Sequence, residues 1–123
     1  MTSRRRLMEK VRVVQITLST TKQDIFTTKT KTIPAGKMRF IVGMFLYGDG
    51  STSATVDIEK KEKDGSYTAL FKKVPVSPAG RVPVPERWNF DLENPIITLE
   101  YGTDLAATAS AGAPEMTIIY YDD

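Results

Sequence analysis

The sequence contains no cysteine and no histidine among its 123 residues. Without cysteine the chain cannot form disulfides, thiolate zinc sites or a cysteine nucleophile. Without histidine it cannot supply an imidazole general base, a Ser-His pair or the common catalytic zinc sites. These two absences predict a protein that is not an enzyme and that needs no metal or cofactor.

Long hydrophobic runs are also absent. No apolar run reaches about 18 residues, so the sequence predicts no membrane-spanning helix. The basic N-terminus is not followed by the apolar core of a signal peptide. We therefore expect a chain that is made and used inside a cell, or that leaves it within an assembly.

The length of the chain suits one domain, and 41% hydrophobic residues is ordinary for a globular protein. The net charge of +2 is too small to imply a polyanion partner for the whole surface. The position of the charges is more informative, because residues 1–10 have no strand pattern and are rich in arginine. We expect a basic N-terminal arm over residues 1–10 and a single domain over residues 11–123.

The arm has two interpretations. It is either a solvated, frayed terminus or a segment that docks on a neighbour, where its arginines meet carboxylates or phosphates. Nucleic acid is disfavoured as the partner, because no aromatic residue is interleaved with the arginines, although the arm alone keeps that option open. The basic residues at issue are Arg4, Arg5, Arg6, Lys10 and Arg12.

Alternation of apolar and polar residues recurs at roughly ten-residue spacing, with turn residues between the runs and no amphipathic helical stretch. One example is residues 11–18, where Val14 and Ile16 share one face and Val13 shares the other with polar residues. The pattern predicts an all-β protein, an antiparallel β-sandwich or jelly roll of about eight or nine strands.

Residues 33–61 are predicted to form the central element, a long antiparallel hairpin. Its strands are residues 38–46 and 54–58, and the turn lies in the Gly-Asp-Gly-Ser segment 48–51. The row of Met38, Phe40, Val42, Met44 and Leu46 defines the main apolar face. Ile41 and Phe45 are out of phase with it, so we expect both sides of this strand to be covered.

Two further segments are candidate contact regions. Residues 25–32 alternate threonine with lysine, which predicts either a protected edge strand or a strand that pairs with another subunit. Residues 75–85 hold four of the seven prolines and predict an extended surface loop that makes contacts.

Motifs for catalysis or ligand binding are weak. Asp57 and Glu59 share a strand face and could pair as acid and base, but charge alternation on a solvated strand gives the same pattern. The Asp-Gly pairs at 49–50 and 64–65 are turns without a calcium-ligand series. Trp88, the single tryptophan, is expected to seal one end of the core, and the alternative is an aromatic platform for a sugar or base.

The overall pattern resembles the small β-sandwich structural proteins of tailed viruses, in particular capsid decoration (cementing) proteins. The resemblance lies in IPAGK at residues 33–37, LEYGTDL at 99–105 and ASAG at 109–112, and extends over residues 33–121. It implies a homo-oligomer, with a trimer as one form, seated on a capsid lattice at the virion surface and latched to the shell by its N-terminal arm.

We therefore expect a non-enzymatic structural protein made in the host cytoplasm, which binds shell subunits through its arm and loops. By residue type Arg81, Arg87 and Trp88 are further candidate interface anchors. The alternatives are a neck or tail component of the same kind of particle, or a carbohydrate- or ligand-binding module that uses Trp88, Tyr67 and Tyr101.

Overall fold

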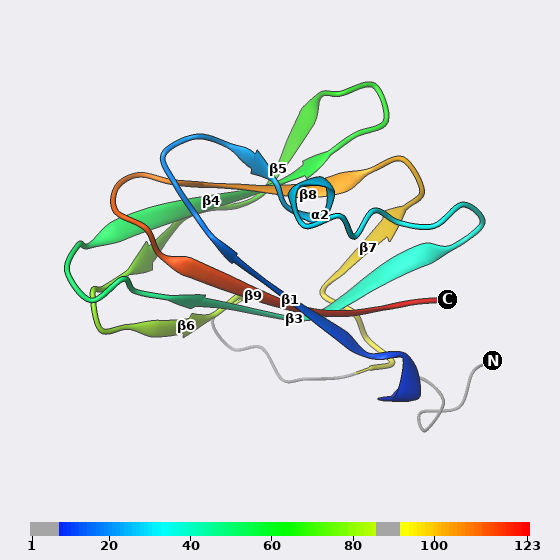
Figure 1. The fold of residues 1–123 in the computed structure, drawn as a ribbon, viewed down its shortest axis with the longest axis horizontal. Helices are drawn as coiled ribbons and strands as arrows, with labels where there is room; N and C mark the ends of the chain where they lie inside the picture. Colours follow the sequence, from blue (N-terminus) through cyan, green and yellow to red (C-terminus); the bar gives the residue numbers. More distant parts are fainter. Residues whose placement is uncertain (1–7, 86–91) are drawn as a thin grey trace.

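The computed structural model describes residues 8–85 and 92–123. These residues form two antiparallel sheets packed face to face, so the all-β sandwich predicted from the sequence is confirmed (Figure 1). The described strands are β1 (Arg12–Thr17), β2 (Gln23–Asp24), β3 (Met38–Tyr47), β4 (Ala54–Lys61), β5 (Tyr67–Val76), β6 (Arg81–Pro83), β7 (Ile97–Glu100), β8 (Asp104–Ala109) and β9 (Glu115–Asp122). The one complete described helix is α2 (Ile25–Thr28), and this part of the chain has none able to cross a bilayer.

The two sheets are built from strands that are far apart in the sequence. Sheet A has the order β1-β9-β3-β6, with β7 also paired to β3, and sheet B has the order β2-β8-β4-β5. The chain changes sheet at most of its connections. The inward faces of both sheets bury one large apolar core, which includes Phe26, Ile41, Ile58 and Ile118.

The predicted central hairpin is wrong, because its two strands lie in different sheets. β3 pairs with β6, β7 and β9, whereas β4 pairs with β5 and β8. The Gly-Asp-Gly-Ser segment therefore crosses between the sheets at one end of the sandwich. Both strands present an apolar face to the same core. In the sequence, two such strands show the same apolar alternation as the two paired strands of a hairpin.

A β-bulge also divides the apolar row predicted along β3. The pairing with β9 shifts between Ile41 and Gly43, which reverses the faces of the residues on either side. Ile41 and Met44 consequently both face the main core, while Val42 lies in a second buried cluster with Leu92 and Tyr121. The expectation that both sides of this strand are covered is confirmed.

Residues 25–32 do not form the predicted threonine-rich strand. Only Gln23 and Asp24 pair with sheet B, and the chain then turns into α2, in which Ile25 and Phe26 are buried. The helix is four residues long, and its first N–H groups are bound by Asp104 of β8. A carboxylate from a distant strand therefore decides the local conformation here.

The proline-rich segment is only partly a loop. β5 extends to Val76 and residues 81–83 pair with β3 as β6, which leaves residues 77–80 as the connection. Pro75 and Pro83 both lie on strands at the edges of the sheets, which is where a residue without an N–H is tolerated.

Arg39 is a buried charged residue at one end of the sandwich, and it is only 2% exposed. Its guanidinium makes a bidentate ion pair with Asp122, with N–O distances of 2.7 and 2.8 Å. It also lies 4.4 Å from the ring centroid of Phe26 and 4.3 Å from that of Tyr120, and it donates to the carbonyl oxygen of Lys31. Arg39 thus fastens the α2 segment to sheet A.

The opposite end is held together by Asp49. Its carboxylate accepts hydrogen bonds from the N–H groups of Ser51 and Thr52 at 2.8 Å and of Ala113 at 3.0 Å. The neighbouring Gly48 N–H donates to Gly80 O at 2.9 Å, and a Cβ on Gly48 would lie 2.1 Å from Ser77 O. Three connections, β3–β4, β5–β6 and β8–β9, are therefore joined in one compact end.

We expect the Arg39–Asp122 pair to be strongly coupled. Asp122→Ala leaves the buried guanidinium without its partner and should lower the free energy of unfolding by about 3 kcal/mol. The double variant Arg39→Met/Asp122→Ala should lose less than the sum of the two single variants, because no unpaired charge remains. Urea denaturation of the four proteins measures this cycle, and additive losses would contradict it.

Asp49 should make the fold sensitive to acid. Hydrogen bonds from the Ser51 and Ala113 backbone lower the pKa of Asp49 from 3.8 to about 2. Its folded-state pKa is depressed, so its stabilising contribution is complete above pH 3.8 and is lost as the pH falls toward 2.

Asp49→Asn removes this titrating group. Between roughly pH 5, the upper limit of carboxylate titration, and about pH 2, its free energy of unfolding should therefore fall less than that of the wild type. Urea denaturation at several pH values measures the difference. Glu115→Gln, an exposed carboxylate on β9, is the matched control and should follow the wild type. Parallel curves for Asp49→Asn and wild type would refute the role of Asp49.

Candidate protein-interaction surfaces

Two of the basic residues predicted as interface anchors lie at the start of β1. Lys10 makes an ion pair with Asp123, and Arg12 donates to the carbonyl oxygens of Glu9 at 3.3 Å and Val11 at 3.0 Å. The Lys10–Asp123 pair connects the beginning of the described chain to its C-terminal end, whereas the Arg12 hydrogen bonds are local. Lys10 and Arg12 are therefore partly engaged within the molecule.

Arg81, the third described anchor, lies on β6 and its guanidinium is 5.8 Å from the ring centroid of Tyr47. β1 and β6 are at opposite edges of sheet A, so the structure does not bring Arg12 and Arg81 together. The other predicted anchors lie outside the described residues: Arg4, Arg5, Arg6, Arg87 and Trp88.

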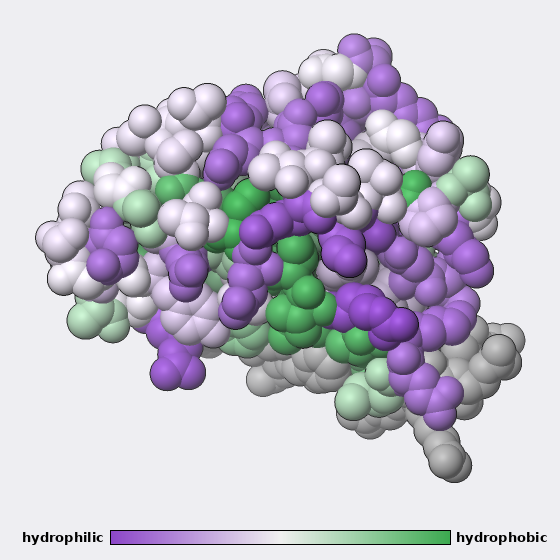
Figure 2. Space-filling view, viewed as in Figure 1, coloured by the Kyte–Doolittle hydropathy of each residue, from purple (hydrophilic) through white to green (hydrophobic). Residues whose placement is uncertain are grey.

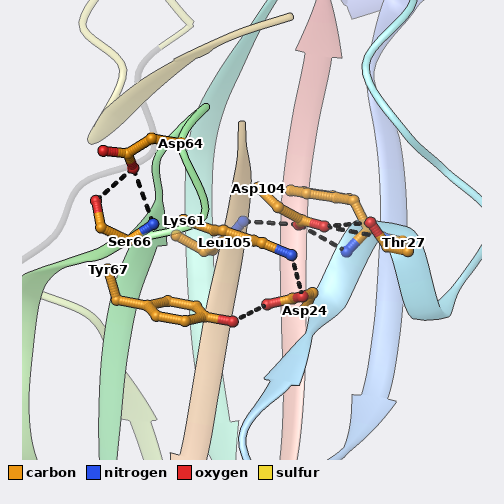
Figure 3. Close-up of polar contacts among 9 residues, drawn as sticks. Asp24, Thr27, Lys61, Asp64, Ser66, Tyr67, Asp104 and Leu105 are labelled. Atoms are coloured by element: carbon orange, nitrogen blue, oxygen red, sulfur yellow. Dashed lines mark hydrogen bonds and ion pairs between the residues drawn. The ribbon is translucent and has the colours of Figure 1, made fainter. Parts of the chain in front are cut away.

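Figure 3 shows how polar side chains connect sheet B to the α2 segment. The Asp104 carboxylate accepts hydrogen bonds from the Phe26 N–H and Thr27 N–H, both at 3.0 Å, and from the Thr27 hydroxyl at 2.7 Å. It also accepts from the Leu105 N–H at 2.7 Å. Asp104 is 4% exposed and has the role of a structural cap, with its oxygen atoms fully used.

Asp24 forms a second polar contact on the outer side of sheet B. It accepts from the Lys61 ammonium at 2.8 Å and from the Tyr67 hydroxyl at 3.0 Å (Figure 3). The hydrogen bond to Asp24 raises the pKa of both Lys61 and Tyr67, because the carboxylate favours their protonated forms. Lys22 lies 3.9 Å from the Tyr67 ring centroid, so this tyrosine is held from two sides.

Asp57 and Glu59, the weak candidate for an acid–base pair, belong to the same face. Glu59 pairs with Lys22 at 2.7 Å and Lys72 at 3.4 Å, and the hydrogen bond from Lys22 lowers its pKa. Asp57 accepts from the Lys73 N–H at 2.8 Å. A general acid needs a raised pKa, so this lysine-paired arrangement fits a structural charge network better than a catalytic pair.

Sheet B therefore presents an outer face on which acids and lysines neutralise one another. Within residues 8–85 and 92–123, no group of three or more acidic side chains is placed to hold a metal ion. The charged groups named above are therefore engaged with one another.

The β1 side of sheet A has a different character. Val13 on β1 is 58% exposed, and it lies opposite Ile119 of β9, which packs against the second apolar cluster. Figure 2 shows hydrophobic residues in the middle of the face on which β1 crosses the molecule in Figure 1. We did not predict this surface from the sequence, although a valine on the polar face of a strand was the available signal.

A pocket of about 320 Å³ lies near α2 and the turn between β7 and β8. Its lining includes Thr27, Lys61, Tyr101 and Asp104. Tyr101 is 55% exposed there, whereas Lys61 and Asp104 are already bound to other groups.

Comparison with known proteins gives few matches. No protein-family model and no curated protein matches this chain. The solved structures that match include two of a pentameric capsid protein isolated from metagenomic phage sequences. In each case the sequence identity is 18%, the TM-score is 0.42, and the alignment covers 89% of this chain and 60% of the other. The chain thus spans less than two thirds of the length of those proteins.

Proposed function

We propose that this protein is a non-enzymatic structural component of a virus particle, a decoration or cementing protein that binds shell subunits. It is made in the host cytoplasm and lies at the capsid surface as a homo-oligomer. Contacts come from the N-terminal arm, with Arg4, Arg5 and Arg6, and from loops such as the one before Arg81.

The observation that supports this proposal most is the order of the strands. The β1-β9-β3-β6 sheet faces the β2-β8-β4-β5 sheet, and most connections cross from one sheet to the other. This strand order supports a jelly roll, an architecture used by viral capsid domains and by lectins. The sequence resemblance to decoration proteins points to the first of these two uses.

The end of the sandwich around Asp49, where three connections are joined, fits a role in binding to a lattice. The β3–β4, β5–β6 and β8–β9 connections are already joined by hydrogen bonds, so little conformational freedom remains to be lost on contact. A repetitive shell allows the loops and the arm to bind at the same time. Several weak contacts of this kind give high avidity.

Removing the positive charge of the arm should weaken attachment. The triple variant Arg4→Ala/Arg5→Ala/Arg6→Ala removes the three charge contacts proposed with the shell, which should reduce affinity for shells about tenfold. The measurement is co-sedimentation of the full chain with shells assembled from the capsid protein of the same genome, at low and high salt.

The matched control removes three exposed lysines elsewhere, in Lys29→Ala/Lys31→Ala/Lys37→Ala, and so has the same net charge. It should sediment like the wild type. Equal retention of both triple variants would refute the arm as the attachment site. Failure of the wild-type chain to sediment with shells would refute the decoration role itself. If electron microscopy located the protein at the neck or tail of the particle, the neck or tail role would be favoured instead.

The second candidate is a carbohydrate-binding module, which the exposed ring of Tyr101 at the pocket favours. Titration with a glycan panel, followed by NMR shifts of residues around the pocket, tests it. Saturable shifts that Tyr101→Ala abolishes would support the module and count against a purely structural role.

A further inference from the structure

β1 is an edge strand with one unpaired side. It pairs with β9 in an unbroken register from Arg12 opposite Tyr120 to Thr17 opposite Glu115. In the part of the chain that the structure describes, no strand pairs with its other edge. A regular six-residue strand with a free row of N–H and C=O groups is a template for another strand.

The other described edges are poor templates. β2, β6 and β7 have only two, three and four residues. β5 is ten residues long, but its pairing with β4 is irregular around Lys72 and Lys73, and Lys73 has a positive φ of 52°. Lysines, bulges and prolines such as Pro75 protect an edge against pairing. β1 contains none of these features.

The composition of β1 also suits a strand–strand contact. Between residues 13 and 17 it has no charge and three β-branched apolar residues, Val13, Val14 and Ile16. The exposed Val13 would gain a neighbouring side chain from an added strand, on the face in whose middle Figure 2 shows hydrophobic residues.

We propose that β1 pairs antiparallel with β1 of a second copy, about a two-fold axis perpendicular to sheet A. This inference rests on the homo-oligomer in the proposed function and specifies its interface. Sheet A then continues across two molecules. If this is the only contact between copies, the oligomer is a dimer and not the trimer that the resemblance implies.

A second copy fits because β1 is complementary to itself. Side chains alternate between the faces, so a two-fold axis must place residues of the same face opposite each other. With the axis at Gln15, the two Gln15 amides face each other, where each can donate and accept. Val13 then lies opposite Thr17, and Arg12 does not meet the second Arg12.

The absence of cysteine from the chain allows a direct test. Gln15→Cys places one thiol of each copy at the proposed axis, where directly opposite Cβ atoms lie about 5 Å apart. A disulfide needs Cβ atoms about 4 Å apart, so a shift of about 1 Å between the two strands allows it to form. Under mild oxidation we expect a covalent dimer to form at least about tenfold faster than in Ala69→Cys, because pairing raises the effective concentration of the thiols. Ala69 is exposed on β5 and is the matched control site.

A second pair of variants tests the same contact without covalent chemistry. Gln15→Lys places two ammonium groups opposite each other at the axis, so it should abolish the dimer in sedimentation equilibrium, while Ala69→Lys should not. Circular dichroism and thermal unfolding confirm that both variants fold. A wild-type chain that stays monomeric at all concentrations, or equal cross-linking of the two cysteine variants, would overturn the proposal. Both experiments use the purified chain alone, so their outcome is independent of shell binding.

Discussion

The buried charge of Arg39 is the constraint on which one end of this sandwich depends. A guanidinium that is removed from water requires a carboxylate and hydrogen-bond acceptors nearby, and Asp122 and the Lys31 carbonyl provide them. Phe26 and Tyr120 pack on the same group and contact each other edge to face, with centroids 5.2 Å apart. The α2 segment, β3 and β9 are therefore positioned by one side chain, while Asp104 fixes α2 to sheet B from the other side.

The sequence was sufficient for the fold class and for most strands, because alternation is a local property. It was insufficient wherever a distant residue decides the structure. The carboxylate that caps α2 lies 78 residues from Phe26, so residues 25–32 looked like a strand. β3 and β4 share a core but not a sheet, and the bulge after Ile41 changed which apolar residues face which cluster. For the candidate sites, residue type identified charges such as Lys10 and Arg81, but not their neighbours or the exposed edge at β1.

The two sheets differ in what they offer to a partner. On the outside of sheet B, lysines and carboxylates such as Lys22 and Glu59 satisfy one another, which leaves a surface suited to water. Sheet A ends in β1, which carries no charge after Arg12 and has an exposed valine, Val13. The second cluster adds apolar side chains on the same sheet. This asymmetry is the physical basis for assigning self-association to sheet A and for expecting other contacts at the loops and the arm.

The position of β9 between β1 and β3 has a consequence for biosynthesis. Sheet A has no β1–β3 pairing of its own, so β1 cannot join the sheet until residues 115–122 have emerged from the ribosome. Until then the apolar faces of β1 and β3 lack the strand that joins them, and such unfinished sheets are prone to aggregate. A chain that stops just before this strand would hold most of the core residues and still lack the strand that joins β1 to β3.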